Sequence, residues 1–121
     1  MKTRLLIADS DEALLPVYER YFSAHDCDVE TAAGGVDCLD KLNRFQPDVV
    51  IVDRHLPWGG GDGVLAAMQS DRSLARIPVV LLDGTDCAST VTGSAKVTHH
   101  DKPVRLATLL ASVRQAAQPS V

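Results

Sequence analysis

The sequence predicts a doubly wound α/β fold, in which helices cover both faces of a parallel β-sheet. Three short apolar runs, at residues 4–8, 49–52 and 79–82, contain no polar alternation. Such uninterrupted runs are typical of strands that are buried on both faces of a parallel sheet. Between and after these runs, apolar residues recur at spacings of three and four, which indicates amphipathic helices. Because strands and helices alternate, right-handed crossovers are expected.

Weaker sequence patterns indicate the remaining strands and the helices of this fold. Residues 29–32 and 96–99 are candidate strands, which brings the predicted sheet to five. Helical spacing is found in four segments, at residues 14–22, 36–42, 64–68 and 106–113. The segment 84–95 is rich in Thr, Ser and Gly, so any fifth helix there has about two turns at most. Either Ser10 or Asp11 is expected to cap the first helix.

Size and composition narrow the possible functions. A chain of 121 residues suits one domain, which we expect over residues 1–118 with a tail at 119–121. The formal net charge of −4 gives no electrostatic signature for binding nucleic acid or an anionic membrane. No apolar run has the length of a membrane span. The three cysteines are odd in number and follow no repeating spacing, which favours the cytoplasm over a disulfide-bonded secreted class.

Charged residues follow several of the predicted strands directly. Asp9 follows the first strand, Asp53 ends the third, and Lys102 comes after the fifth. In sheets of this class, ligands bind beyond the carboxyl ends of the strands, where the strand order reverses. Two neighbouring carboxylates repel unless a cation lies between them, and Mg²⁺ binds to one or two carboxylates, a carbonyl and waters. A carboxylate held by a metal and an ammonium can attack a phosphoryl donor. Taken singly, each acid could instead cap the helix that follows it.

Four sequence motifs carry a resemblance to a known family. They are LLIADSDEALL at 5–15, GGVDCLDKL at 34–42, PDVVIVDRHLP at 47–57 and DKPV at 101–104. From Lys2 to about Gln118 the chain resembles the receiver domain of two-component response regulators. This resemblance implies a flavodoxin-like fold with strand order 2-1-3-4-5. It also implies a signalling domain rather than an enzyme, a histidine kinase or phosphotransfer protein as donor, an effector partner, and a monomer or weak dimer.

The resemblance also assigns roles to individual residues. Asp53 resembles the phosphoacceptor, and Asp9 resembles an acid of the Mg²⁺ site. The backbone carbonyl of His55 would be the third protein ligand of the metal. Lys102 resembles the lysine that pairs with the acceptor and then with the phosphoryl group, and Pro103 the proline that follows it, often through a cis bond.

The sequence departs from the family pattern at several positions. Ser10 stands where a second acid is usual and could hold only a metal-bound water, so we expect weaker Mg²⁺ binding. Asp83 replaces the usual Thr or Ser, and His99 replaces the usual Tyr or Phe, so the usual switch pair is absent. Asp83 could pair with Lys102 or with His99, or could cap the next segment while His99 points outward. Residues 58–61 suggest a longer loop before the third helix.

Two alternative functions stay open from the sequence. A degenerate receiver would bind a partner without phosphorylation, which the unusual switch positions favour. An enzyme resembling the haloacid-dehalogenase-like phosphatases would use Asp9 of the Asp9-Ser10-Asp11 motif as its nucleophile. The chain is short for that second fold, which would also leave Asp53 without a role.

Overall fold

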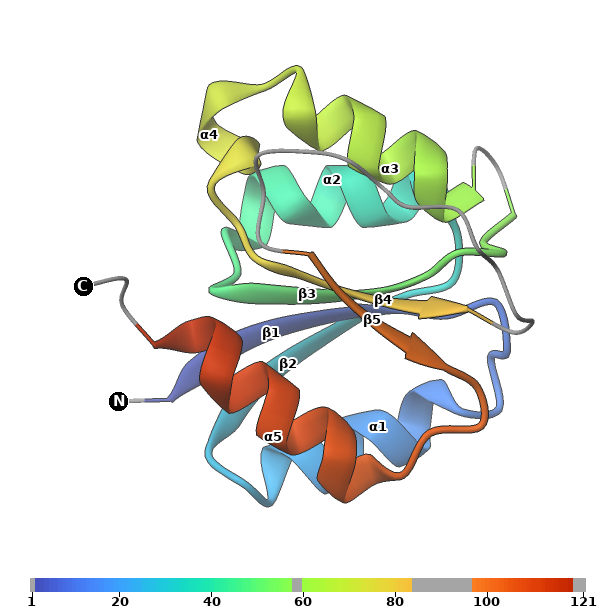
Figure 1. Cartoon of the computed structure of the whole chain (residues 1–121), viewed down its shortest axis with the longest axis vertical. Helices are drawn as coiled ribbons and strands as arrows, with labels where there is room; N and C mark the ends of the chain where they lie inside the picture. Colours follow the sequence, from blue (N-terminus) through green and yellow to red (C-terminus); the bar gives the residue numbers. More distant parts are fainter. Residues whose placement is uncertain (1, 58–59, 84–96, 119–121) are drawn as a thin grey trace.

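The five strands form one parallel sheet that lies between two layers of helices (Figure 1). The computed structural model describes residues 2–57, 60–83 and 97–118. The strands are β1 (Thr3–Ala8), β2 (Cys27–Ala32), β3 (Val49–Asp53), β4 (Val79–Asp83) and β5 (Val97–Asp101). The helices are α1 (Leu15–Ser23), α2 (Gly35–Phe45), α3 (Gly60–Gln69), α4 (Arg72–Ala75) and α5 (Leu106–Ala117). The strand order is β2-β1-β3-β4-β5, which confirms the predicted fold.

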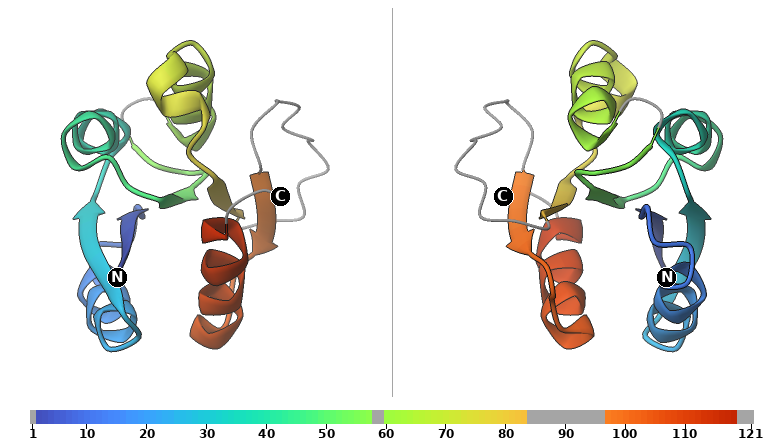
Figure 2. Two further views of the ribbon diagram at one scale, coloured as in Figure 1. Left: turned by 90° about the vertical axis from the view of Figure 1, so that its left-hand side faces the viewer. Right: turned by 90° about the vertical axis from the view of Figure 1, so that its right-hand side faces the viewer.

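The core is divided by the sheet into two apolar layers. Helices α1 and α5 cover one face, while α2, α3 and α4 cover the other (Figure 2). Along β1, Leu5 and Ile7 pack toward the first layer, and Leu6 and Ala8 pack toward the second. This alternation explains why residues 5–8 of β1 are all apolar: both faces of the strand are buried there.

The edge strands explain the weaker sequence signals. Every residue of β3 and β4 is buried, whereas β2 and β5 each contain exposed positions. An edge strand has a neighbour on one side only, so it tolerates polar side chains that a central strand does not. The same order places the carboxyl ends of β1 and β3 side by side, with Ala8 in register with Val52.

The start of α1 differs from the prediction. The expected cap by Ser10 or Asp11 is wrong, because the helix begins later, at Leu15, and its cap position makes no side-chain hydrogen bond. The Asp11 carboxylate instead accepts a hydrogen bond from the amide of Ala13, in the turn before the helix. Proline in the first turn suits this start, since its missing N–H has no intrahelical partner there.

The start of α3 also differs. The helix begins at Gly60, so only residues 58–59 separate it from Pro57, and the prediction of a longer loop is wrong. The reason is close packing. A Cβ atom at Gly61 would lie 2.6 Å from the Cα of Arg54 and 2.8 Å from the carbonyl oxygen of Asp53. Glycine at this position lets the first turn of α3 rest on the backbone at the end of β3, where the Gly61 amide donates to the Arg54 carbonyl.

One helix was not expected from the sequence. The four residues of α4 follow Asp71, whose side chain accepts from the amide of Ser73 as a helix cap. Helices α3 and α4 therefore both precede β4, and the alternation is not strict. The fifth helix expected within 84–95 and the tail at 119–121 lie outside the described residues. In the described part of the chain, no helix has the length and apolar character that crossing a membrane requires.

Candidate functional site

Three buried carboxylates lie at the carboxyl edge of the sheet. Among the described residues, Asp9, Asp53 and Asp83 are the charged side chains that are buried, with exposures of 0%, 1% and 3%. They directly follow or end the central strands β1, β3 and β4. A buried carboxylate is costly unless it is paired or hydrogen-bonded, so the partners of these three acids define the site.

The ammonium of Lys102 lies between two of these acids. Its Nζ is 3.1 and 3.0 Å from the two carboxylate oxygens of Asp9, and 3.5 Å from Oδ2 of Asp53. The backbone amide of Lys102 donates to the carbonyl of Asp83 at 2.7 Å, which holds the end of β5 against β4. The bond between Lys102 and Pro103 is cis. The structure thus brings together three residues that are distant in the sequence, at positions 9, 53 and 102.

Asp53 accepts hydrogen bonds from donors other than Lys102 on both of its carboxylate oxygens. Its Oδ2 accepts from the amide and the hydroxyl of Ser10, at 3.0 and 2.5 Å, and its Oδ1 accepts from the amide of His55 at 3.0 Å. Burial acts to raise the pKa of Asp53. The bonds from Ser10 and His55, together with the Lys102 ammonium, outweigh burial and lower this pKa below its ordinary value. Ser10, which the sequence suggested only as a holder of a water, therefore contacts Asp53 directly.

Asp9 has two further donors, one of which sequence reasoning missed. Its Oδ1 accepts from the amide of Asp11 at 2.9 Å, and its Oδ2 accepts from the hydroxyl of Tyr18 at 3.0 Å. Tyr18 has the spacing of the apolar stripe of α1, and its ring is indeed buried. Apolar periodicity cannot indicate where the hydroxyl points. We refer to Asp9, Ser10, Tyr18, Asp53 and Lys102 as the Lys102 cluster.

Asp83 belongs to a second group of charges. Its carboxylate is 3.0 Å from Nη1 of Arg54 and 3.5 Å from Nε2 of His55. The guanidinium of Arg54 also donates to Asp62 in the first turn of α3, from Nε at 3.3 Å and from Nη2 at 3.2 Å. We refer to Arg54, His55, Asp62 and Asp83 as the Arg54 cluster.

The Arg54 cluster corrects two expectations for Asp83. Among the described residues, the basic side chains next to its carboxylate are those of Arg54 and His55, so the pairings with Lys102 and with His99 are wrong. The positions of the two basic side chains explain this. The Lys102 ammonium already lies between the carboxylates of Asp9 and Asp53, while the Arg54 side chain extends from the end of β3 toward Asp83 at the end of β4. The side chain of His99 is exposed, as expected if it points outward. The segment that Asp83 could cap lies outside the described residues.

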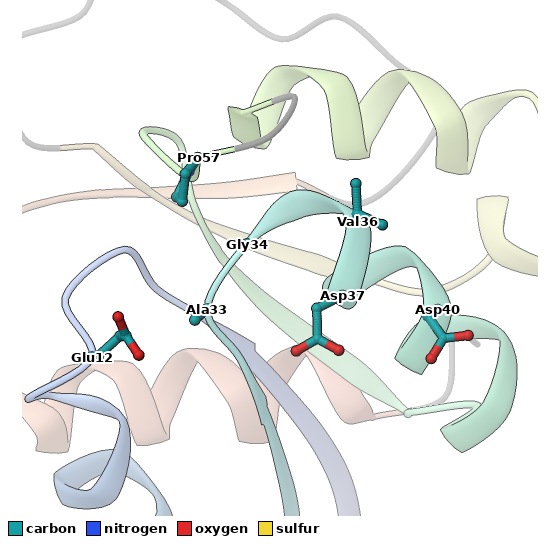
Figure 3. A pocket seen from close by; sticks show the side chains of 7 residues that line it. All are labelled: Glu12, Ala33, Gly34, Val36, Asp37, Asp40 and Pro57. Carbon is teal, nitrogen blue, oxygen red and sulfur yellow. The ribbon is translucent and has the colours of Figure 1, made fainter.

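The described residues form two open hollows on this edge of the molecule. One, of about 670 Å³, is bordered by the loops after β1, β2 and β3 and by the start of α2 (Figure 3). Glu12, Asp37 and Asp40 give it an acidic lining, although Asp37 and Asp40 also pair with Lys41 and Arg44 of the same helix. The other, of about 570 Å³, lies beside Lys102 and has a mostly apolar lining of seven residues: Leu14, Val17, Tyr18, Lys102, Pro103, Val104 and Leu106. The carboxyl edge is therefore accessible to a partner.

Comparison with known proteins identifies the family. The family model described as the response regulator receiver domain matches residues 5–114. The chain belongs to this family. The receiver is 30% identical over 117 residues to the response regulator MprA of Mycobacterium sp. (strain KMS), an alignment that covers 94% of the receiver and 50% of MprA. The chain thus spans half of the length of this curated relative, and only 19% of another.

Solved structures agree with this fold. The receiver domain of the Francisella response regulator 1452 superposes with a TM-score of 0.86 at 20% identity, covering 96% of this chain and 97% of that one. The receiver domain of the sensor histidine kinase PA1611 from Pseudomonas aeruginosa superposes with a TM-score of 0.80 at 17% identity, covering 97% and 98%. That structure is described with a magnesium ion coordinated in its active-site cleft. These matches give no support to the phosphatase or to the degenerate receiver.

The donor set of the receiver fits a small hard cation. Asp9 and Asp53 already enclose one positive charge, the Lys102 ammonium, at distances typical of ion pairs. Oxygen ligands of this kind are those that Mg²⁺ prefers. Among the described residues, no three Asp, Glu, His or Cys side chains are arranged as a metal site. In that part of the chain the side chains at this site offer two carboxylates, those of Asp9 and Asp53, and backbone carbonyls and waters are the other oxygen ligands that Mg²⁺ commonly uses.

Proposed function

We propose that this receiver accepts a phosphoryl group on Asp53 from a histidine kinase or phosphotransfer protein, with Mg²⁺ bound, and relays its state to an effector. The observation that carries the proposal is the position of Lys102, whose ammonium contacts the carboxylates of both Asp9 and Asp53. Such an ammonium offsets the charge of an incoming phosphoryl group and positions the acceptor carboxylate.

Transfer needs little covalent chemistry from the protein. A carboxylate oxygen of Asp53 forms a bond to phosphorus while the bond between phosphorus and the donor nitrogen breaks, and the released imidazole takes up a proton. The lowered pKa of Asp53 keeps this carboxylate ionised and able to attack. Lys102 then exchanges its contact with Asp9 for the negatively charged phosphoryl oxygens. This exchange is possible because a lysine ammonium is a compact charge on a flexible stem.

Asp9, Asp53 and the backbone carbonyl of His55 would hold Mg²⁺, which supplies further neutralisation of the phosphoryl charge. Ser10 could hold a metal-bound water once its hydroxyl turns away from Asp53, to which it donates here. We expect weaker Mg²⁺ affinity than in receivers with an acid at this position, because the side chains supply one negative charge fewer.

The donor and the compartment belong to the same proposal. The apolar hollow beside Lys102 supports approach by a protein donor, since it offers contact surface next to the acceptor. A cytoplasmic setting is supported by the thiols of Cys27 and Cys38, which are free and buried. Burial raises the pKa of the Cys38 thiol to about 12, so this thiol stays protonated and unreactive.

The proposal is tested with a small-molecule phosphodonor. We expect the chain, incubated with acetyl phosphate and Mg²⁺, to gain the mass of one phosphoryl group, and Asp53→Asn to gain none. Asp62→Asn is the matched control, because Asp62 is an exposed acid at the same edge. Beryllium fluoride with Mg²⁺ should shift the backbone amide resonances around Asp53 in the original chain.

Absence of any adduct and of any beryllium fluoride response would defeat the proposal. An adduct that persists in Asp53→Asn would place the acceptor elsewhere, and a phosphoryl group trapped on Asp9 would revive the phosphatase.

A further inference from the structure

Tyr18 is a buried tyrosine whose hydroxyl reaches the charged site from the core side. It lies on α1 with 4% of its surface exposed, and its hydroxyl donates to Oδ2 of Asp9 at 3.0 Å. A leucine or phenylalanine would fill the same apolar position without this bond. Because an ionised carboxylate can only accept hydrogen bonds, the hydroxyl of Tyr18 is the donor in this contact.

The hydrogen bonds of Asp9 show what this hydroxyl controls. An ionised carboxylate has about four acceptor positions. In Asp9 they receive the amide of Asp11, the hydroxyl of Tyr18, and one contact per oxygen from Lys102. Two of these donors belong to neighbouring parts of the fold, since Asp11 lies in the turn between β1 and α1 and Tyr18 lies on α1. Only the ammonium of Lys102 can leave when another cation enters.

We propose that Tyr18 is a positioning residue of the receiver: its hydroxyl fixes which edge of the Asp9 carboxylate faces the bound divalent cation, and thereby strengthens Mg²⁺ binding. This inference rests on the proposed function, since it concerns the same site. Groups that orient a metal-binding carboxylate from behind typically contribute a factor of about 10 to 100 in metal affinity. Without the hydroxyl, the Asp9 carboxylate keeps the Asp11 amide and the Lys102 ammonium as donors but loses the donor on α1 that holds Oδ2, so its orientation is less firmly fixed.

Isothermal titration of the whole chain with MgCl₂ tests this inference. We expect Tyr18→Phe to bind Mg²⁺ about tenfold more weakly than the original chain. The matched control is Tyr21→Phe, which removes a hydroxyl from the same helix. The Tyr21 ring packs against Phe22 and His25 rather than against the Lys102 cluster. Loss of the Tyr21 hydroxyl should therefore leave the affinity for Mg²⁺ unchanged.

A second measurement needs no variant at position 18. The chain contains two tyrosines, so labelling with ¹³Cζ-tyrosine gives two resonances, which Tyr21→Phe assigns. Mg²⁺ should shift the resonance of Tyr18, because the cation draws electron density from the Asp9 carboxylate, which accepts the hydrogen bond of the Tyr18 hydroxyl. The resonance of Tyr21 should not move.

Either of two results would overturn the inference: equal Mg²⁺ affinity in Tyr18→Phe and the original chain, or a Tyr18 resonance that ignores Mg²⁺. In both cases the proposed function survives, because the original chain still binds the cation. If the original chain binds no Mg²⁺, the inference and the metal-dependent function fail together.

Discussion

The Lys102 cluster and the Arg54 cluster use similar ingredients at the same edge of the sheet, yet they differ in what they can do. In each, a long basic side chain neutralises a buried carboxylate. Lys102 places a compact ammonium between two buried acids. Arg54 spreads a planar guanidinium between buried Asp83 and exposed Asp62, and so joins β4 to α3. An ammonium on a flexible stem can yield its place to another cation, whereas a guanidinium with several fixed donors is harder to displace. The Lys102 cluster is therefore suited to exchanging its ammonium for another cation, and the Arg54 cluster is suited to holding β4 and α3 together.

Removal of the Lys102 charge should have the largest effect. Lys102→Met leaves two buried carboxylates without their shared cation. We expect the free energy of unfolding to fall by about 3 kcal/mol at pH 7, the low end for an uncompensated buried charge, because Lys102 itself is 24% exposed. Chemical denaturation measures the loss. The deficit should shrink on acidification, which discharges the carboxylates, and on addition of Mg²⁺, which replaces the missing cation.

The matched control for this variant is Lys41→Met. Lys41 pairs with Asp37 across one turn of α2 at 3.5 Å and also donates to the carbonyl of Thr31. The Asp37 side chain is 49% exposed, whereas the carboxylates that Lys102 contacts are buried. Exposed pairs of this kind contribute less than about 1 kcal/mol. A loss in Lys102→Met no larger than that in Lys41→Met would show that the Lys102 charge has no special role in stability.

Arg54→Met should cost less, about 2 kcal/mol, because His55 stays close to the Asp83 carboxylate. The double variant Arg54→Met with Asp83→Leu should regain most of this loss, since it removes both charges together. It should also keep the phosphoryl adduct on Asp53, as measured by intact mass. A double variant that folds but takes up no phosphoryl group would contradict the supporting role of the Arg54 cluster.

The smallest expected effect concerns the Ser10 hydroxyl. Ser10→Ala removes one donor from Asp53, which should lower the free energy of unfolding by about 1 kcal/mol at pH 7. The native pKa of Asp53 lies below its ordinary value of 3.8, so this contribution is present above pH 3.8 and is lost as the pH falls through the native pKa. Denaturation curves at several pH values should show the two chains converging in acid.

Ser73→Ala is the control for Ser10→Ala, because the Ser73 hydroxyl also donates to an aspartate, Asp71, but on the exposed surface. We expect its effect to be the smaller of the two. A larger effect in Ser73→Ala would mean that burial adds nothing to the bond between Ser10 and Asp53.

These two clusters also show what could be predicted from the sequence. The central strands were clear because burial on both faces requires uninterrupted apolar runs, and strand order then brought Asp9 and Asp53 together. The sequence pattern around Arg54 did not indicate its pairing with Asp83. Arg54 follows Asp53 directly, and no spacing rule says that a guanidinium at a strand end reaches Asp83, which is 29 positions away. The four residues of α4 are too few to establish a helical period.

The roles of Tyr18 and Gly61 were not predicted for another reason: each residue has a second role beside the one that its sequence pattern indicates. Periodicity detects the buried ring of Tyr18 but not its hydroxyl. The glycines at 59–61 suggested a loop, whereas Gly61 is required for contact between α3 and the end of β3. Chemistry that depends on a single atom, or on the absence of one, does not appear in an apolar pattern.

The contact at Gly61 has a consequence for how this receiver tolerates change. Even one methyl group there would strike the peptide that joins Asp53 to Arg54, and both clusters depend on the position of that peptide. A substitution of Gly61 by alanine, which changes no charge, should therefore prevent phosphorylation of Asp53 although every ionisable residue is still present. In a mutational survey, position 61 should rank with the acids themselves.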